Sequence, residues 1–183
     1  ITDLSFAHGP LNVNYQNNFQ FPVSTASDKK YVYIRTRKEG VQQKNCYLKA
    51  EANGIKSRNN EVVRTDLQSM RSYLENDANQ WAFVKKDGTF SQFYIYNKST
   101  GDKVLYLSAA NSDTKLTMGD KNATTGFTSF YIAPQPSSFT EITGGFTIQP
   151  DDSNKNAVGD HNDAGVLSYW VRGGNQSALE DNG

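Results

Sequence analysis

The sequence predicts an all-β domain built from three related units. Three observations support this: strand-like phrases recur along the chain, turn signals separate them, and aromatic residues are abundant. The chain has 183 residues, with ten Tyr and ten Phe but only two Trp and two Met. Aromatic side chains fit a pleated, half-buried surface, so this composition favours strands. The length allows about one domain with one sizeable core.

Each unit is expected to contain an opening strand, a second strand and an aromatic closing strand. The strands are expected at residues 31–34, 47–48 and 79–83 in the first copy, at 93–96, 105–107 and 130–132 in the second, and at 146–148 and 166–170 in the third. Counted from Ile148, the spacing of the first two copies places the third closing aromatic at or beyond Gly183. The third copy is therefore predicted to lack its last strand.

Turn signals separate these strands. Asn53-Gly54 and Asp87-Gly88 are pairs that tolerate positive φ, which is typical of tight hairpins. Many short strands with turns at this density favour a barrel or a sandwich.

One segment has helical periodicity. Between Asn60 and Asn76, the apolar residues Val63, Leu67, Met70 and Leu74 recur at spacings of three and four. Asn60 is a candidate cap for the start of such a helix. We expect one short inserted helix that packs over an end of the barrel.

Residues 1–29 lack clear periodicity and are rich in Asn, Gln, Ser and Pro. We interpret them as a lead-in or linker segment, with the main domain at 30–183. Within them, residues 19–23 alternate and could form a short strand ended by Pro22. An additional edge strand is the alternative for this stretch.

The charge and the polar residues argue against several classes of protein. Lys plus Arg and Asp plus Glu each count 19, so the net charge is zero and no basic stripe indicates a nucleic-acid partner. No apolar run is long enough for a membrane span. Cys46 is the only cysteine, and the two histidines, His8 and His161, belong to no metal-ligand pattern. We expect neither a metal nor a cofactor.

The first closing strand carries a family resemblance. Asn79-Gln80-Trp81 resembles the Gln-x-Trp signature of the ricin-type β-trefoil lectin family, with Asn79 in place of Gln. The phrase at residues 94–101, followed by Leu105-Tyr106-Leu107, is similar to the same family. The resemblance covers residues 30–183 and implies a β-trefoil with repeats at about 30–88, 89–139 and 140–183. The alternating residues expected in its core are Tyr31, Tyr33, Leu48, Trp81, Phe83, Ile95, Leu107, Phe130, Ile132, Phe146 and Ile148.

The resemblance also implies sugar pockets, each with an Asp after the second strand and an aromatic residue that stacks on the sugar. Lys49 and Ser108 take the acidic position in the first two copies, which argues against pockets there. The third copy combines more polar and aromatic residues, and its candidate ligand-binding residues are Asn156, Asp160, His161, Asn162, Tyr169 and Trp170. The alternative is a solvated loop beside one core aromatic.

The favoured function is a non-catalytic carbohydrate-binding module. We expect an accessory domain of a secreted or cell-surface glycan-processing protein, with a glycan as ligand and neighbouring domains in a longer parent chain. No catalytic residues are assigned, and an enzyme is the least favoured class. The alternative is a structural or protein-interaction trefoil whose sugar pockets have decayed.

Overall fold

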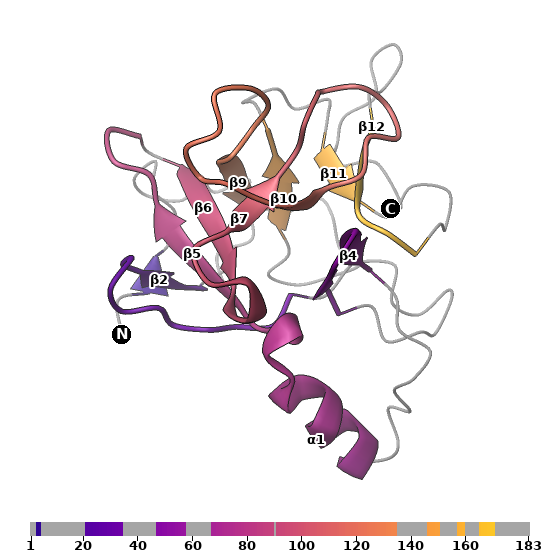
Figure 1. The fold of residues 1–183 in the computed structure, drawn as a ribbon. Helices are drawn as coiled ribbons and strands as arrows, with labels where there is room; N and C mark the ends of the chain where they lie inside the picture. The colour runs from indigo at the N-terminus through magenta and orange to yellow at the C-terminus, as the bar shows by residue number, and fades with distance from the viewer. Residues whose placement is uncertain are drawn as a thin grey trace.

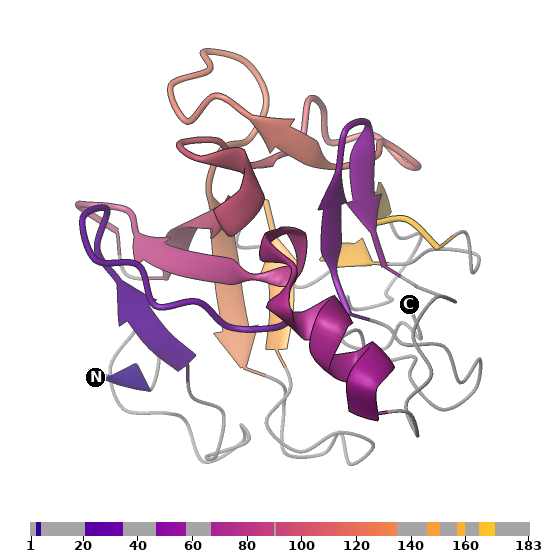
Figure 2. The same cartoon turned by 60° about the horizontal axis from the view of Figure 1, so that its bottom comes forward.

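A computed structural model describes residues 3–4, 21–34, 47–57, 67–89, 91–134, 146–150, 157–159 and 165–170. Most regular structure in these residues is β-strand, which confirms the all-β prediction. The described α-helix is α1 (Leu67–Glu75), which extends away from the strands (Figures 1 and 2). Two single-turn 3-10 helices, η1 (Asp77–Asn79) and η2 (Lys98–Thr100), flank the longest strands.

The strands form one large sheet and two separate hairpins. The large sheet has the spatial order β1 (Asp3–Leu4), β2 (Phe21–Ser24), β5 (Trp81–Lys85), β6 (Gln92–Asn97), β7 (Val104–Tyr106) and β8 (Thr117–Gly119), with β9 (Phe130–Pro134) on β6 and β10 (Phe146–Gln149) on β9. The two hairpins are β3 (Lys49–Glu51) with β4 (Gly54–Lys56), and β11 (Ala157–Gly159) with β12 (Ser168–Trp170).

Strand pairing connects the predicted copies in a regular way. The closing strand of one copy pairs antiparallel with the opening strand of the next, as β5 does with β6 and β9 does with β10. Within a copy, the opening strand meets the closing strand: Phe93 pairs with Phe130, and Val32 bridges to Trp81. The same two relations therefore hold in successive copies.

Residues of three short hairpins also bond to one another. The backbone N–H of Leu167 donates to the carbonyl of Ile55 at 2.8 Å, and the N–H of Leu116 donates to the carbonyl of Leu167 at 3.1 Å. These residues belong to the β11–β12, β3–β4 and β7–β8 hairpin regions, one from each predicted copy. All three side chains are buried.

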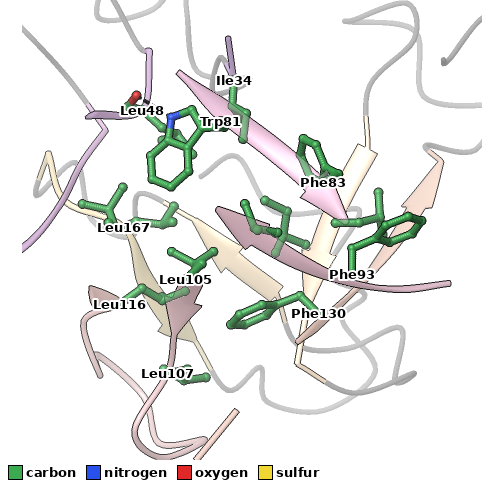
Figure 3. Packing of buried hydrophobic residues seen from close by; sticks show 14 of the residues in the cluster. Ile34, Leu48, Trp81, Phe83, Phe93, Leu105, Leu107, Leu116, Phe130 and Leu167 are labelled. Atoms are coloured by element: carbon green, nitrogen blue, oxygen red, sulfur yellow. Dashed lines mark hydrogen bonds between the residues drawn. The ribbon is translucent and has the colours of Figure 1, made fainter. Parts of the chain in front are cut away.

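The main core lies where these strands and hairpins face each other (Figure 3). Its largest fully buried side chains are Trp81, Tyr169, Phe83, Phe93, Phe130, Ile55, Ile95, Leu105, Leu107, Leu116 and Ile132. The indole N–H of Trp81 donates to the carbonyl of Leu48 at 2.9 Å, so its polar edge is satisfied inside the core. Closing aromatic residues thus fill the centre of the molecule, as the sequence predicts.

Tyr31 and Tyr33 are not core residues, contrary to the sequence prediction. Their exposed fractions are 37% and 46%, whereas Ile34 is buried and Val32 packs against the core. The backbones of Val32 and Trp81 bond to each other in both directions, at 2.7 and 2.9 Å. Directly paired residues share a face, so this bridge turns Val32 inward together with Trp81. Tyr31 and Tyr33, on either side of Val32, therefore point outward.

Part of the predicted lead-in segment belongs to the sheet. β2 pairs in parallel with β5 through Val23–Phe83 and Ser24–Val84, on the side of β5 opposite β6. Figure 2 shows β2, in indigo, beside β5. The strand also continues through Pro22 to Ser24, whereas the sequence predicted that Pro22 would end it. The domain boundary at residue 30 stays a prediction.

The predicted helix is confirmed over its second half, since α1 contains Leu67, Met70 and Leu74. Asn60 and Val63 lie outside the described residues. Tyr73 is buried, and its hydroxyl donates to the carbonyl of Tyr47 at 3.3 Å, which joins the helix to the strand region.

Candidate functional site

Most of the site predicted in the third copy lies outside the described residues. This applies to Asn156, Asp160, His161 and Asn162, and only the backbone of Trp170, in β12, is described. The exposed fraction of Tyr169 is 1%, and its ring belongs to the main core. A ring buried in this way has no face for a sugar, so Tyr169 is a core residue. The remainder of that site stays a prediction.

The described surface instead presents two neighbouring tyrosines. Tyr31 and Tyr33 are the exposed large hydrophobic side chains of the described residues. They alternate with the inward residues Val32 and Ile34, so both project from the outer side of one extended segment. We call the surface formed by Tyr31, Tyr33, Asp77, Gln80 and Lys98 the tyrosine face.

Tyr33 is held in position by contacts on two sides. Its hydroxyl donates to the carbonyl of Leu74 at 3.0 Å, in the last turn of α1. Its ring meets the ring of Tyr47 edge to face, with centroids 6.3 Å apart and planes at 83°. Tyr47 in turn lies beside Tyr73 of α1, at 6.1 Å between centroids. The helix therefore supports an aromatic ring that remains nearly half exposed.

Gln80 connects Tyr33 to the rest of the face. Its side-chain N–H groups donate to the carbonyls of Leu74 and Glu75 at 3.3 and 3.4 Å. Gln80 and Tyr33 thus share the Leu74 carbonyl and satisfy acceptors that the end of a helix leaves open. The side-chain oxygen of Gln80 accepts from the Lys98 ammonium at 3.5 Å.

Lys98 brings the charged groups together. Its Nζ lies 3.3 Å from Oδ1 of Asp77 and 5.4 Å from the centroid of the Tyr31 ring. Its backbone N–H donates to the carbonyl of Gln80 at 2.9 Å, which fixes the start of η2 beside η1. Its side chain is 41% exposed and that of Asp77 is 56% exposed, so the pair faces solvent and adds little stability by itself.

Two asparagines that cap η1 and η2 fix the backbone beneath this face. The side chain of Asn97, at the start of η2, accepts from the backbone N–H of Ser99 at 3.0 Å and donates to the carbonyl of Ala78 at 2.8 Å. Asn76 caps η1 by accepting from the N–H of Ala78 at 2.9 Å. These bonds tie η1 and η2 together, so Asp77 and Lys98 come from two turns with a fixed relation.

The face can provide three kinds of interaction to a ligand. The tyrosine rings offer apolar, electron-rich faces, the Asp77 carboxylate and the Gln80 amide accept hydrogen bonds, and the Lys98 ammonium donates them. Among the residues that the structure describes, no group of His, Cys, Asp or Glu is arranged to hold a metal ion. None of their helices is long and apolar enough to cross a membrane.

Sequence reasoning missed this face because both tyrosines were assigned to the core. Residues 31–34 read Tyr-Val-Tyr-Ile, in which either alternate set is apolar enough to be buried. Lys29 and Lys30 directly before Tyr31 were a signal that the segment borders solvent. Asp77, Gln80 and Lys98 lie far from Tyr31 in the sequence, and no local pattern joins them.

Comparison with known proteins is limited. No family model matches the chain, and no curated protein matches it. Among solved structures, the chain is similar to the GlcNAcα1-4Gal releasing endo-β-galactosidase from Clostridium perfringens, with 16% sequence identity and a TM-score of 0.48. The similarity covers 81% of this chain and 31% of that one, so this chain spans about a third of the enzyme's length. The resemblance to ricin-type lectins stays a prediction from the sequence.

Proposed function

We propose that this chain is a non-catalytic carbohydrate-binding module and that the tyrosine face binds the glycan. The observation that carries the proposal is the exposure of two neighbouring tyrosine rings, one of them held in position, beside a carboxylate, an amide and an ammonium group. A sugar ring has apolar C–H faces and hydroxyls at its rim, which match such a surface. Because Tyr33 is already held by Leu74 and Tyr47, little conformational freedom is lost on binding.

The proposal includes the β-trefoil fold. Three short hairpins that bond to one another, together with closing strands that pair with the next opening strand, support a threefold arrangement. The proposal also includes an accessory role, outside the catalytic step, in a secreted or cell-surface protein that acts on glycans. Both additions extend the sequence resemblance rather than the geometry of the face.

The test is a binding measurement with matched tyrosine variants. Glycan-array screening identifies a ligand, and titration calorimetry then compares wild type with Tyr33→Ala and Tyr31→Ala. We expect each substitution to weaken binding by tenfold or more, about 1.4 kcal/mol. Tyr31→Ala should change the unfolding midpoint little, whereas Tyr33→Ala should lower it slightly because the bond to the Leu74 carbonyl and the contact with Tyr47 are lost. Tyr94→Ala is the control, since the Lys121 ammonium lies 5.4 Å from its ring just as Lys98 does from Tyr31.

A structural or protein-interaction role is the second candidate. Exposed tyrosines are enriched at protein interfaces as well, so the same face suits that role. A folded wild type that binds nothing on arrays of plant, host and microbial glycans would favour this candidate. Equal losses in Tyr33→Ala and Tyr94→Ala would show that the ligand lies elsewhere.

A further inference from the structure

Lys98 is the ammonium of the tyrosine face, and its charge is already engaged. Asp77 Oδ1 lies 3.3 Å from Nζ, the Gln80 side-chain oxygen lies 3.5 Å away, and the Tyr31 ring lies below at 5.4 Å. Each of these groups presents negative charge or a negative ring face to the ammonium. Lys98 therefore has acceptors on several sides before any ligand arrives.

Several other charged groups near the face are already engaged: Lys30 lies 3.0 Å from Asp28, and the Lys29 ammonium lies over the Tyr96 ring at 4.7 Å. Glu75 ends α1 and is paired with Arg71, whose Nε lies 3.4 Å from Oε1 of Glu75. The carbonyls of Leu74 and Glu75, at the negative end of the helix dipole, also point into this region, where they accept from Gln80. An anion that approaches Lys98 therefore meets the Asp77 carboxylate and the end of a helix.

We propose that Asp77 sets the specificity of the tyrosine face by neutralising Lys98, so that the face accepts uncharged sugars and rejects glycans bearing carboxylate or sulfate groups. The inference rests on the proposed function and names its class of ligand. Two neighbouring hydroxyls of a neutral sugar satisfy the pair as it stands, one donating to Asp77 and the other accepting from Lys98. A sulfate must either displace Asp77 from Lys98 or lie beside a carboxylate of like charge, and in both cases it gains less from Lys98 than it would if Asp77 were uncharged.

The test removes the carboxylate charge while keeping the side-chain shape. Retention by dextran sulfate and by dextran in affinity electrophoresis at low salt is compared for wild type, Asp77→Asn and the double variant Asp77→Asn/Lys98→Met. We expect Asp77→Asn to be retained by dextran sulfate at least fivefold more strongly than wild type, and the double variant to return to the wild-type value. Salt should abolish the gain.

A matched control separates this effect from a general change in net charge. Glu51→Gln removes the carboxylate charge that lies 3.9 Å from the Lys56 ammonium in the β3–β4 hairpin, and it alters net charge by the same amount. We expect it to leave dextran sulfate retention within twofold of wild type. A gain equal to that of Asp77→Asn would overturn the assignment to Lys98.

The outcomes distinguish the inference from the proposed function. Wild type that binds carboxylated or sulfated glycans on the array in preference to neutral ones overturns the inference and leaves carbohydrate binding intact. A blank array combined with a gain in Asp77→Asn that depends on Lys98 supports the charge assignment and removes the proposed function. No gain in Asp77→Asn contradicts the inference whatever the array shows.

Discussion

The side chain of Tyr106 packs closely against the backbone of Gly119. Adding a single carbon at Gly119 is therefore expected to destabilise the fold. A Cβ at Gly119 would lie 2.8 Å from Cγ and 2.9 Å from Cβ of Tyr106. The hydroxyl end of the same side chain donates to the carbonyl of Thr125 at 3.2 Å. Because the side chain is held at its far end and touched close to its own backbone, it has little freedom to move aside.

Gly119→Ala is therefore expected to lower the free energy of unfolding by about 1–3 kcal/mol, measured by urea denaturation. Gly54→Ala is the control, because a Cβ there meets only the Leu116 carbonyl, at an ordinary 3.8 Å. Neither glycine has a positive φ, so backbone strain does not enter the comparison. Equal stability of Gly119→Ala and Gly54→Ala would show that Tyr106 repacks freely.

At this same scale, sequence reasoning identified the core well but assigned one segment to the wrong face. The closing residues Trp81 and Phe130 were easy to assign to the core, because large apolar side chains at regular spacing are seldom stable in solvent. Tyr31 and Tyr33 have a polar end and are stable in either environment. Only the bridge between Val32 and Trp81, formed by residues far apart in the sequence, decides their direction.

At the scale of elements, β2 is the strand that the sequence describes least well. Its residues Phe21–Ser24 include a proline and lie in a polar stretch, which is typical of a linker. In the structure, Val23 packs against the core, and the Ser24 hydroxyl accepts from the backbone N–H of Lys30 at 2.7 Å. Lys29 lies over the Tyr96 ring at 4.7 Å, so this region covers part of the outer face of β6.

Removal of residues 1–29 is expected to lower the thermal unfolding midpoint by several degrees. The deletion leaves the backbone edge of β5 at Phe83 and Val84 without β2, and it exposes the apolar surface against which Val23 packs. Differential scanning calorimetry measures the change. A shorter deletion of residues 1–20 retains β2 and removes β1, so its effect should be smaller. An unchanged midpoint in the longer deletion would support a linker and contradict a structural role for β2.

The helix and the hairpins show why other elements were predictable. Met70 and Leu74 follow helical spacing, and Asp87-Gly88, whose glycine has a φ of 75°, lies between the paired strands β5 and β6. Both signals are formed by residues close together in the chain, so they can be recognised from a single sequence. The meeting of η1 with η2, which brings Asp77 to Lys98, depends on the pairing of β5 with β6 and has no local signal.

At the scale of the whole molecule, the strand pairing links the three predicted copies. β5 closes the first predicted copy but pairs over its full length with β6 of the second, and β9 pairs with β10 of the third in a similar way. A single copy would lose these partners and expose strand edges on both sides. The bond from the Leu167 N–H to the Ile55 carbonyl joins the third predicted copy to the first. Solenoid repeats lack such a contact, since each unit there touches only its neighbours along the chain.

We therefore expect the fragment of residues 89–139, one predicted copy, to be unfolded in isolation, as judged by poor dispersion in its amide NMR spectrum. The full chain is expected to unfold in one cooperative transition, with equal calorimetric and van't Hoff enthalpies. A folded fragment, or two separated transitions in the full chain, would show that the copies are independent units.

The bond between Leu167 and Ile55 also affects the order of events during synthesis. The β3–β4 hairpin leaves the ribosome long before residue 167, by on the order of ten seconds at usual rates of translation. During that time the Ile55 carbonyl lacks its bond from Leu167, and the core around Ile55 is incomplete. The same hairpin carries Lys49, Glu51 and Lys56, and charges that flank an apolar strand residue discourage association with other chains. These charges therefore oppose association of the early hairpin with other chains until the late contact closes.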